Sequence, residues 1–424
     1  MDKFVIEGPT PLQGTIHVSG SKNAALPLMA AALLADSPTT LHLIPKLRDI
    51  YTFNSVLRET GASVTFDEEN HTLHIDPSSL TSTVAPYDLV RKMRASFYML
   101  GALLGREGKA KVSLPGGCAW GPRPVDLHLK GMEAMGAEID LEEGYVIGRF
   151  TDEVVEGGEF TLNPSSVGAT INLVLAAVKR AKQFIIRNAA KEPDVVLLCN
   201  TLKNMGAHID GIGTSVLTIR HTEELSGIEA RNDPDRIETG TYMIAAAMHP
   251  ESEVTIAGCE PAQLGVFTDV FRKLGVTCEL TGDEIYIRSS DTIRPVDVKT
   301  AIYPGFPTDL QAQWATLMTQ AKGTSRVTDT IYFDRFSYVP ELNRLGANLS
   351  VVENQVTIEG GHPLSGTAIM STDLRASVSL VLAATIAEGT SHVLRVYHLD
   401  RGYEQLEAKL NNLGASIRRE KQDE

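Results

Sequence analysis

The chain of 424 residues is long enough for two domains that each bury a core of their own. Its 43% hydrophobic and 22% charged residues are typical of a globular protein, and no apolar stretch reaches the roughly 18 residues that suggest a membrane span. A net charge of −14 argues against a protein that binds nucleic acids or acidic membranes over its whole surface, so we expect neither partner.

The N-terminus and the cysteines narrow the setting further. Residues 1–5 lack the basic start and the long apolar run of a signal peptide, so we expect a cytoplasmic protein. Cys118, Cys199, Cys259 and Cys278 are far apart in the sequence, which argues against a disulfide framework and against a zinc site. We therefore expect no metal, and no motif points to a cofactor.

A motif of about 70 residues recurs six times along the chain. In each copy an amphipathic helix pattern ends at a glycine followed by Ala or Val, which is typical of a helix that closes with a left-handed residue. Two short strand patterns follow the glycine, for example residues 277–280 and 284–287. The glycines, 68 to 75 residues apart, are Gly61, Gly136, Gly206, Gly275, Gly346 and Gly414.

Each copy also contains a helix pattern that is apolar nearly all round, as at residues 169–177 and 376–384. A helix without a polar face is buried on every side. The repeat therefore predicts an α/β protein of six βαβαββ units, with the sheets outside and the apolar helices inside. The alternative is a doubly wound α/β protein with a buried sheet, which the repeat period disfavours.

Six copies predict two domains of three copies each. We place the first domain at residues 22–233, and the second at residues 1–21 together with 234–424. The two strands expected within the first 20 residues fit no complete copy, so we expect them to complete the domain that holds the C-terminus.

The first segment that packing does not require is Gly-Ser-Lys-Asn at residues 20–23, which leads into a buried helix. Backbone amides, a lysine and a side-chain amide at a helix N-terminus favour an anion. Taken alone, a lysine such as Lys22 is more often a solvated surface residue.

The second segment is the loop at residues 113–126, which holds three glycines, three prolines, a thiol, an arginine and a carboxylate. Loops of this kind often carry function. A structural role is the commoner one for a cysteine, but the Gly-Gly context and the nearby Arg123 favour a reactive thiol at Cys118. The other three cysteines lie in helix-like or strand-like patterns and are interpreted as packing residues.

The third segment is Pro-Thr-Asp at residues 307–309, which begins an apolar helix. Two roles remain open for Asp309 on the residues alone. It is either a carboxylate that stabilises the helix N-terminus or a general base.

Arginines also gather at expected helix starts, where the helix dipole does not favour them. Several arginines placed in this way indicate an external anion. They are Arg94, Arg236, Arg375 and Arg401.

Together, the repeat and these segments resemble the enolpyruvyl transferase family, and within it the enzymes that act on UDP-N-acetylglucosamine at the start of bacterial peptidoglycan synthesis. The resemblance covers essentially the whole chain and implies two inside-out α/β domains with the active site in the cleft between them. Six motifs carry it in order: Gly-Ser-Lys-Asn-Ala-Ala at 20–25, Leu-Pro-Gly-Gly-Cys at 114–118, Arg-Pro-Val-Asp-Leu-His at 123–128, Phe-Pro-Thr-Asp at 306–309, Thr-Asp-Leu-Arg-Ala-Ser at 372–377 and His-Leu-Asp-Arg-Gly-Tyr-Glu at 398–404.

The resemblance implies transfer of the enolpyruvyl group of phosphoenolpyruvate to the 3-hydroxyl of UDP-N-acetylglucosamine, with release of phosphate. It implies that Cys118 protonates C3 of phosphoenolpyruvate, forms an adduct with it, and is alkylated by the inhibitor fosfomycin. Asp309 corresponds to the residue that binds and deprotonates the 3-hydroxyl. Lys22, Arg123 and Arg401 correspond to the cations around the phosphate and carboxylate of phosphoenolpyruvate.

The resemblance also implies a larger substrate site, over which the loop that carries Cys118 closes as a lid. Asp373 and Arg375 correspond to a pair near the reacting centre, and Arg335 and Glu192 are further candidates. The residues that correspond to the UDP-sugar site are Asn23, Arg94, Arg123, Pro124, Val125, Asp126, Leu127, Ser166, Val167 and Ile331.

Two positions depart from the family pattern. Pro-Ser-Ser at residues 164–166 stands where the family can carry a basic residue for the UDP moiety, and Phe333 stands where a carboxylate is expected. Neither departure involves a residue that is assigned to the chemistry.

Two other functions compete with this interpretation. The related enzymes that act on shikimate 3-phosphate share the fold, but the Leu-Pro-Gly-Gly-Cys and Arg-Pro-Val-Asp segments speak against them. A catalytically silent duplicate that only binds UDP-sugars is the other alternative, and intact Lys22, Cys118, Asp309 and Arg401 argue against it.

Overall fold

The computed structural model describes residues 2–91, 93–115 and 125–421. The chain divides into two compact units: unit 1 is Met1–Ser19 with Pro234–Glu424, and unit 2 is Gly20–Asp233. The second junction lies where the sequence places it, and the first lies two residues earlier. Ser21 belongs to unit 2 because its amide donates to the carbonyl of Asp233 at 2.7 Å.

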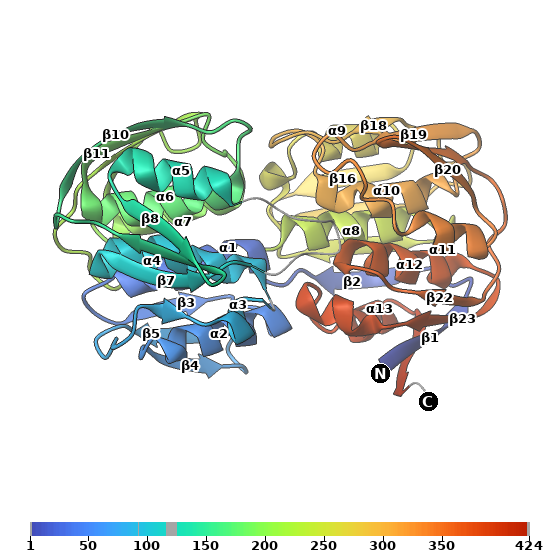
Figure 1. The fold of residues 1–424 in the computed structure, drawn as a ribbon. Helices are drawn as coiled ribbons and strands as arrows, with labels where there is room; N and C mark the ends of the chain where they lie inside the picture. Colours follow the sequence, from blue (N-terminus) through green and yellow to red (C-terminus); the bar gives the residue numbers. More distant parts are fainter. Residues whose placement is uncertain (1, 92, 116–124, 422–424) are drawn as a thin grey trace. The chain divides into compact units, whose positions relative to one another are not determined.

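Unit 2 contains three copies of the repeat, each with one four-stranded sheet (Figure 1). The sheets have the strand orders β14-β3-β5-β4, β6-β7-β9-β8 and β10-β11-β13-β12, and in each the first two strands are parallel and the others antiparallel. The strands are β3 Thr39–His42, β4 Ser63–Asp67, β5 Thr72–Asp76, β6 Val84–Ala85, β7 Lys109–Ser113, β8 Glu138–Glu142, β9 Tyr145–Arg149, β10 Val155–Thr161, β11 Ala181–Arg187, β12 His208–Asp210, β13 Val216–Arg220 and β14 Glu229–Arg231. The helices are α1 Lys22–Ala31, α2 Arg48–Glu59, α3 Tyr87–Val90, α4 Tyr98–Glu107, α5 Asp126–Met135, α6 Val167–Arg180 and α7 Pro193–Asn204.

Unit 1 follows the same plan, with the strand orders β2-β15-β17-β16, β18-β19-β21-β20 and β22-β23-β1-β24. The strands are β1 Asp2–Gly8, β2 Gln13–His17, β15 Glu253–Ala257, β16 Thr277–Thr281, β17 Glu284–Arg288, β18 Val298–Lys299, β19 Thr324–Thr328, β20 Asn348–Val352, β21 Gln355–Glu359, β22 Ala368–Met370, β23 Gly389–Leu394 and β24 Ser416–Lys421. The helices are α8 Arg236–Ala247, α9 Phe267–Arg272, α10 Gln311–Met318, α11 Val339–Arg344, α12 Leu374–Ile386 and α13 Leu406–Asn412.

The two N-terminal strands complete unit 1, as the sequence predicts. β1 lies between β23 and β24, with Val5 opposite His392 on one side and Arg418 on the other. β2 pairs in parallel with β15 and so supplies the parallel edge strand of that sheet. The last strand of unit 2, β14, does the same for β3, the first strand that follows α1.

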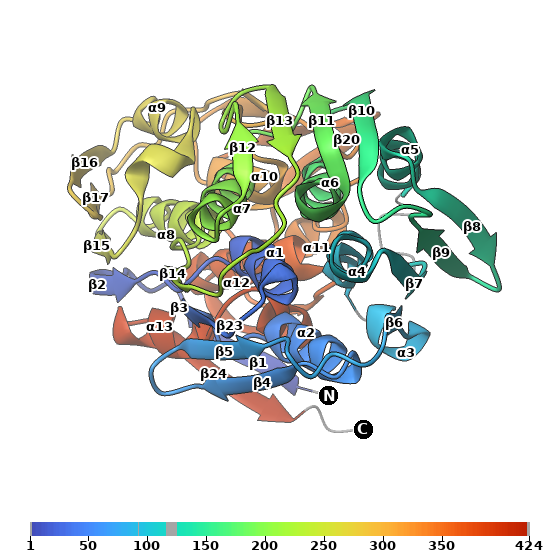
Figure 2. The ribbon, with the colours of Figure 1, turned by 90° about the vertical axis from the view of Figure 1, so that its left-hand side faces the viewer.

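The helices of the inner layer are buried on nearly all sides, which confirms the predicted arrangement of helices inside and sheets outside. Every residue of α6 from Ala169 to Val178 is buried, as is every residue of α12 from Arg375 to Thr385. Figure 2 shows the sheets of unit 2 at its periphery, around α1, α4 and α6. In β13, for example, the buried Leu217 and Ile219 alternate with exposed or half-buried residues, which is the pattern of a sheet with one wet face.

The six repeated glycines close their helices as predicted. Each has a φ between +89° and +117°, the left-handed region in which a side chain is strained. The period of about 70 residues in the sequence therefore corresponds to the distance along the chain between equivalent helix C-termini.

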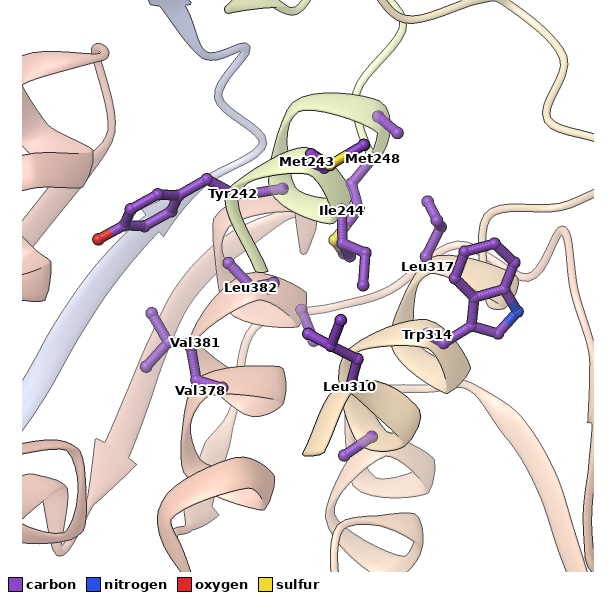
Figure 3. Packing of buried hydrophobic residues seen from close by; sticks show 14 of the residues in the cluster. Tyr242, Met243, Ile244, Met248, Leu310, Trp314, Leu317, Val378, Val381 and Leu382 are labelled. Carbon is purple, nitrogen blue, oxygen red and sulfur yellow. The ribbon is translucent and has the colours of Figure 1, made fainter. Parts of the chain in front are cut away.

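Leu310 anchors the segment before α10 in the core of unit 1. Figure 3 shows Leu310 in the middle of a hydrophobic cluster, with Trp314 of α10 on one side and Tyr242 of α8 and Val378 of α12 on the other, and all four side chains are buried. Gly240 on α8 allows this packing, since a Cβ at that position would lie 2.5 Å from Leu310 Cδ1. Asp309 directly precedes Leu310 in the chain. The packing of Leu310 in the core therefore fixes the backbone position from which the Asp309 side chain extends.

In the described part of the chain, every helix is too short or too polar to cross a membrane. Within the same residues, no group of three or more His, Cys, Asp or Glu side chains is arranged to hold a metal ion.

Candidate active site

Asp309 of unit 1 is held by two arginines. It lies in a 3-10 turn, Thr308–Leu310, directly before α10. Arg335 Nη1 donates to Asp309 Oδ1 at 2.7 Å, and Arg375 Nη2 donates to Asp309 Oδ2 at 2.9 Å. The two arginine side chains are only 9% and 5% exposed, while Asp309 keeps 27% exposure. The carboxylate therefore contacts arginine rather than the amides of α10, which disfavours the helix-stabilising role.

The charges around Asp309 set its protonation state. Burial raises the pKa of the Asp309 carboxyl, but the guanidinium groups of Arg375 and Arg335 outweigh burial and hold that pKa well below its usual range. Asp309 is thus ionised at neutral pH. It is also a weak base for as long as both arginines remain in contact with it.

Polar groups behind the pair fix Arg375 in place. Its Nη1 donates to the hydroxyl of Tyr403 at 3.2 Å, and that hydroxyl also lies 2.8 Å from Thr241 Oγ1. Burial raises the pKa of Tyr403, so the phenol stays protonated. Asp373 caps α12 by accepting from the amides of Arg375 at 2.9 Å and Ala376 at 3.2 Å.

Arg375, for which the sequence predicts an external anion, has an anionic partner within the chain. Its internal partner is Asp309, which comes from a segment 66 positions away in the sequence. Arg236 at the start of α8 lies over the ring of Tyr303, with 5.6 Å between the guanidinium carbon and the ring centroid. Neither contact is visible in a local sequence pattern.

Ile331 and Arg401 lie in two further turns of unit 1. The amide of Ile331 donates to the carboxylate of Asp329 at 2.9 Å. Arg401 ends a 3-10 turn, Val396–Arg401, and the residue before it, Asp400, accepts a bidentate contact from Arg419 at 2.7 and 3.0 Å. Unit 1 therefore contains Asp309, Ile331, Arg335, Asp373, Arg375 and Arg401 of the predicted residues.

Lys22 of unit 2 is the first residue of α1, and Ser21 caps this helix by accepting from the amide of Ala24 at 3.2 Å. Lys22 Nζ donates to Asp49 Oδ2 at 3.1 Å, with side-chain exposures of 11% and 5%. Asp49, in the first turn of α2, is a partner that the sequence analysis missed. An acidic residue at a helix start is common, so it carries no separate signal.

Three segments of unit 2 with predicted residues meet around His128. Asn172 Nδ2 donates to His128 Nδ1 at 2.8 Å and to the carbonyl of Phe97 at 3.2 Å. His128 belongs to α5, Asn172 to α6, and Phe97 ends the 3-10 turn that begins at Arg94. The starts of these elements carry Arg94, then Val125, Asp126 and Leu127, and finally Ser166 and Val167.

His128 is neutral in this arrangement. Burial and the charge of Arg94 lower its pKa to about 3, so the ring does not carry a charge at neutral pH. Because Nδ1 accepts from Asn172, the ring proton resides on Nε2. No role for His128 follows from the sequence alone. The signal was its place at the end of Arg-Pro-Val-Asp-Leu-His.

The remaining predicted residues of unit 2 lie as follows. Ser166 caps α6 by accepting from the amide of Ala169 at 3.2 Å, and Glu192 directly precedes α7. Asn23 follows Lys22 in α1 and is half-buried. Cys118, Arg123 and Pro124 lie outside the described residues.

Comparisons with known proteins agree on one family. The family model of EPSP synthase (3-phosphoshikimate 1-carboxyvinyltransferase) matches residues 6–410. The UDP-N-acetylglucosamine 1-carboxyvinyltransferase of Chloroherpeton thalassium is 51% identical over 425 residues, which cover 100% of this chain and 98% of that protein. The protein of the same name from Chlorobium limicola is also 51% identical, with 100% of both chains covered.

Solved structures show the same fold. The enolpyruvyl transferase NikO from Streptomyces tendae superposes with a TM-score of 0.90 at 26% identity, over 99% of this chain and 98% of that one. An EPSP synthase from Acinetobacter baumannii superposes with a TM-score of 0.78 at 17% identity, over 99% and 100%, which shows the fold alone. The chain therefore belongs to the enolpyruvyl transferase family, in the group of the UDP-N-acetylglucosamine 1-carboxyvinyltransferases.

Proposed function

We propose that this chain transfers the enolpyruvyl group of phosphoenolpyruvate to the 3-hydroxyl of UDP-N-acetylglucosamine and releases phosphate, as the first committed step of peptidoglycan synthesis in the cytoplasm. The observation that carries the proposal is the full-length identity of 51% to relatives that are named for this reaction. The chemistry requires a group that accepts the hydroxyl proton, cations that bind the phosphate and the carboxylate, and an acid for C3.

Asp309 is the proposed acceptor of the 3-hydroxyl proton. It is ionised, partly exposed and fixed in orientation, so it can bind the hydroxyl before the reaction. Asp309 is a weak base because the positive charges of Arg335 and Arg375 stabilise its ionised form. An anionic substrate group that draws either guanidinium away raises the basicity of Asp309 when the substrates are in place.

The bond changes balance in two steps. In the first, O3 of the sugar bonds to C2 of phosphoenolpyruvate, the hydroxyl proton passes to Asp309, and Cys118 gives a proton to C3. In the second, a proton returns from C3 to the Cys118 thiolate, the C2–C3 double bond forms again, the C2–O bond breaks with its electron pair on phosphate, and the proton on Asp309 passes to the released phosphate. Lys22, Arg123 and Arg401 are proposed to hold the phosphate and carboxylate during both steps.

Acceptor choice tests the function. We expect phosphate release when phosphoenolpyruvate is offered with UDP-N-acetylglucosamine and none when it is offered with shikimate 3-phosphate. Release with shikimate 3-phosphate alone would overturn the proposal. Calorimetric binding of UDP-N-acetylglucosamine without any phosphate release would instead favour a silent UDP-sugar binder.

Fosfomycin is expected to label one cysteine, Cys118. Burial raises the pKa of the Cys199 thiol to about 12 and that of the Cys259 thiol to about 11, and it also raises the pKa of Cys278. These three thiols therefore hold little thiolate at neutral pH, and thiolate is the form that reacts. Peptide mass spectrometry of the treated protein gives the labelled position.

Two variants complete this labelling experiment. Cys118→Asp keeps an acid but removes the nucleophile, so it should take no label. Cys278→Ser should be labelled as the wild type is. Label recovered on Cys199 or Cys259 would count against the assignment of Cys118.

A further inference from the structure

A buried carboxylate next to the Asp309 site has no role in the mechanism above. Asp329, which follows β19, is fully buried and accepts four hydrogen bonds. Thr308 Oγ1 donates to Oδ2 at 2.6 Å, while Thr300 Oγ1 at 2.7 Å and the amides of Ile331 at 2.9 Å and Tyr332 at 3.0 Å donate to Oδ1. Three donors on Oδ1 and one on Oδ2 hold this carboxylate in one orientation.

One of these bonds leads to Asp309. Arg335 can only donate to the Thr308 oxygen, so the Thr308 hydroxyl keeps its own proton to donate to Asp329. The Thr308 oxygen then accepts from Arg335 Nη1 at 3.1 Å, and the same Nη1 donates to Asp309 Oδ1 at 2.7 Å. A guanidinium only donates, so every bond in this chain has a single direction. Asp329 is thereby linked through one hydroxyl to the Arg335 group that contacts Asp309.

The other oxygen of Asp329 holds the turn that contains Ile331. Its bonds to the amides of Ile331 and Tyr332 close this turn directly after β19. One buried side chain thus ties the Thr308–Leu310 turn to the Ile331 turn. Under the proposed function, the first supplies the proton acceptor and the second contacts the UDP-sugar.

We propose that Asp329 is a positioning residue for the reaction, which sets Arg335 against Asp309 through Thr308 and holds the Ile331 turn through its amides. The proposal rests on the proposed function. Asp329 touches no reacting atom in this role. It acts through Thr308 and Arg335, so loss of the Thr308 link should lower kcat more than it weakens binding of the UDP-sugar.

Two matched variants test the proposal, because Thr308 and Thr300 each give one hydroxyl bond to Asp329. Thr308→Val removes the bond that leads to Asp309. Thr300→Val removes a bond that leads only into the fold, together with the bond that Thr300 Oγ1 accepts from the Thr330 amide at 2.9 Å. Thr308→Val also removes two bonds, because Thr308 Oγ1 accepts from Arg335 Nη1 as well, so a purely structural role predicts that the two changes lower kcat about equally.

We expect Thr308→Val to lower kcat by about tenfold, the size of a lost hydrogen bond to a charged group, with the Kd for UDP-N-acetylglucosamine within about twofold. Thr300→Val should lower Tm at least as much but leave kcat within about twofold. Thr308→Ser, which keeps the hydroxyl, should restore kcat. Phosphate release, calorimetry and thermal unfolding of the full chain supply the three measurements.

The outcomes separate the two proposals. An active wild type with equal kcat in Thr308→Val and Thr300→Val would overturn the positioning role alone. A loss of kcat in Thr308→Ser as large as in Thr308→Val would also overturn it, because the hydroxyl would not be the cause. If the wild type releases no phosphate from the two substrates, the proposed function fails, and the positioning proposal fails with it.

Discussion

Asp309→Asn is expected to lower kcat by about 10²- to 10⁴-fold, the usual contribution of a general base. The change keeps the shape of the side chain but removes the charge that accepts the 3-hydroxyl proton. UDP-N-acetylglucosamine should still bind, since most of its proposed contacts lie in unit 2 around α5 and α6. Phosphate release under saturating substrates gives kcat, and calorimetry gives the affinity for the UDP-sugar.

Asp309→Asn also removes the charged partner of two arginines. Its effect on stability must therefore be measured separately from its effect on kcat. Arg335 and Arg375 are almost fully buried and lose their carboxylate partner, so we expect a lower Tm as well. Asp334→Asn is the matched control, because Asp334 is an exposed acid in the neighbouring turn and its change should leave kcat within about twofold. A loss of less than about tenfold in Asp309→Asn, equal to about 1.4 kcal/mol, would argue against the role of proton acceptor.

The parts of the fold that the sequence predicts are those that repeat. A helix C-terminus with a left-handed glycine recurs six times, and each instance reports the same local conformation. All-apolar helices in the same copies predict burial without knowledge of the neighbours. Both signals are local, so chain order is enough to place the helices inside and the sheets outside.

The contacts that adjust the site are not local, and sequence patterns do not reveal them. Asp309 pairs with Arg335, which is 26 positions away in the sequence, and with Arg375, which is 66 positions away. Lys22 pairs with Asp49 of the next helix, 27 positions further along the chain. Each of these residues occupies an ordinary position at a helix start or in a turn. Only the packing of the repeats turns these separate residues into ion pairs.

Phe333 stands where the family pattern leads us to expect a carboxylate. Phe333 lies between Ile331 and Arg335 in unit 1, and its side chain is 66% exposed. Neither the bonds of Asp329 nor those of Arg335 involve its side chain. The substitution therefore leaves the arrangement around Asp309 intact.

Gly101→Ala is expected to destabilise unit 2 strongly. Gly101 lies where α4 crosses α6, and a Cβ there would be 2.4 Å from the carbonyl oxygen of Asn172 and 2.7 Å from its Oδ1. The amide of Gly101 also donates to Asn172 Oδ1 at 2.7 Å, so the two helices would have to separate and lose this bond. Overpacking costs about 3 kcal/mol at the high end, and for a unit of this size that lowers Tm by about 6 to 12 °C.

Gly131→Ala separates the clash from other effects of the substitution. Gly131 lies on α5, and its added Cβ would meet the end of the Leu173 side chain, with 2.6 Å to Cδ2. Both changes put alanine into a helix and gain the same propensity, about 1 kcal/mol. The Leu173 side chain can turn aside, whereas the backbone oxygen of Asn172 on the same helix, α6, cannot. We therefore expect Gly131→Ala to lose at most half the Tm that Gly101→Ala loses, and equal losses would show that the contact with the α6 backbone is not the cause.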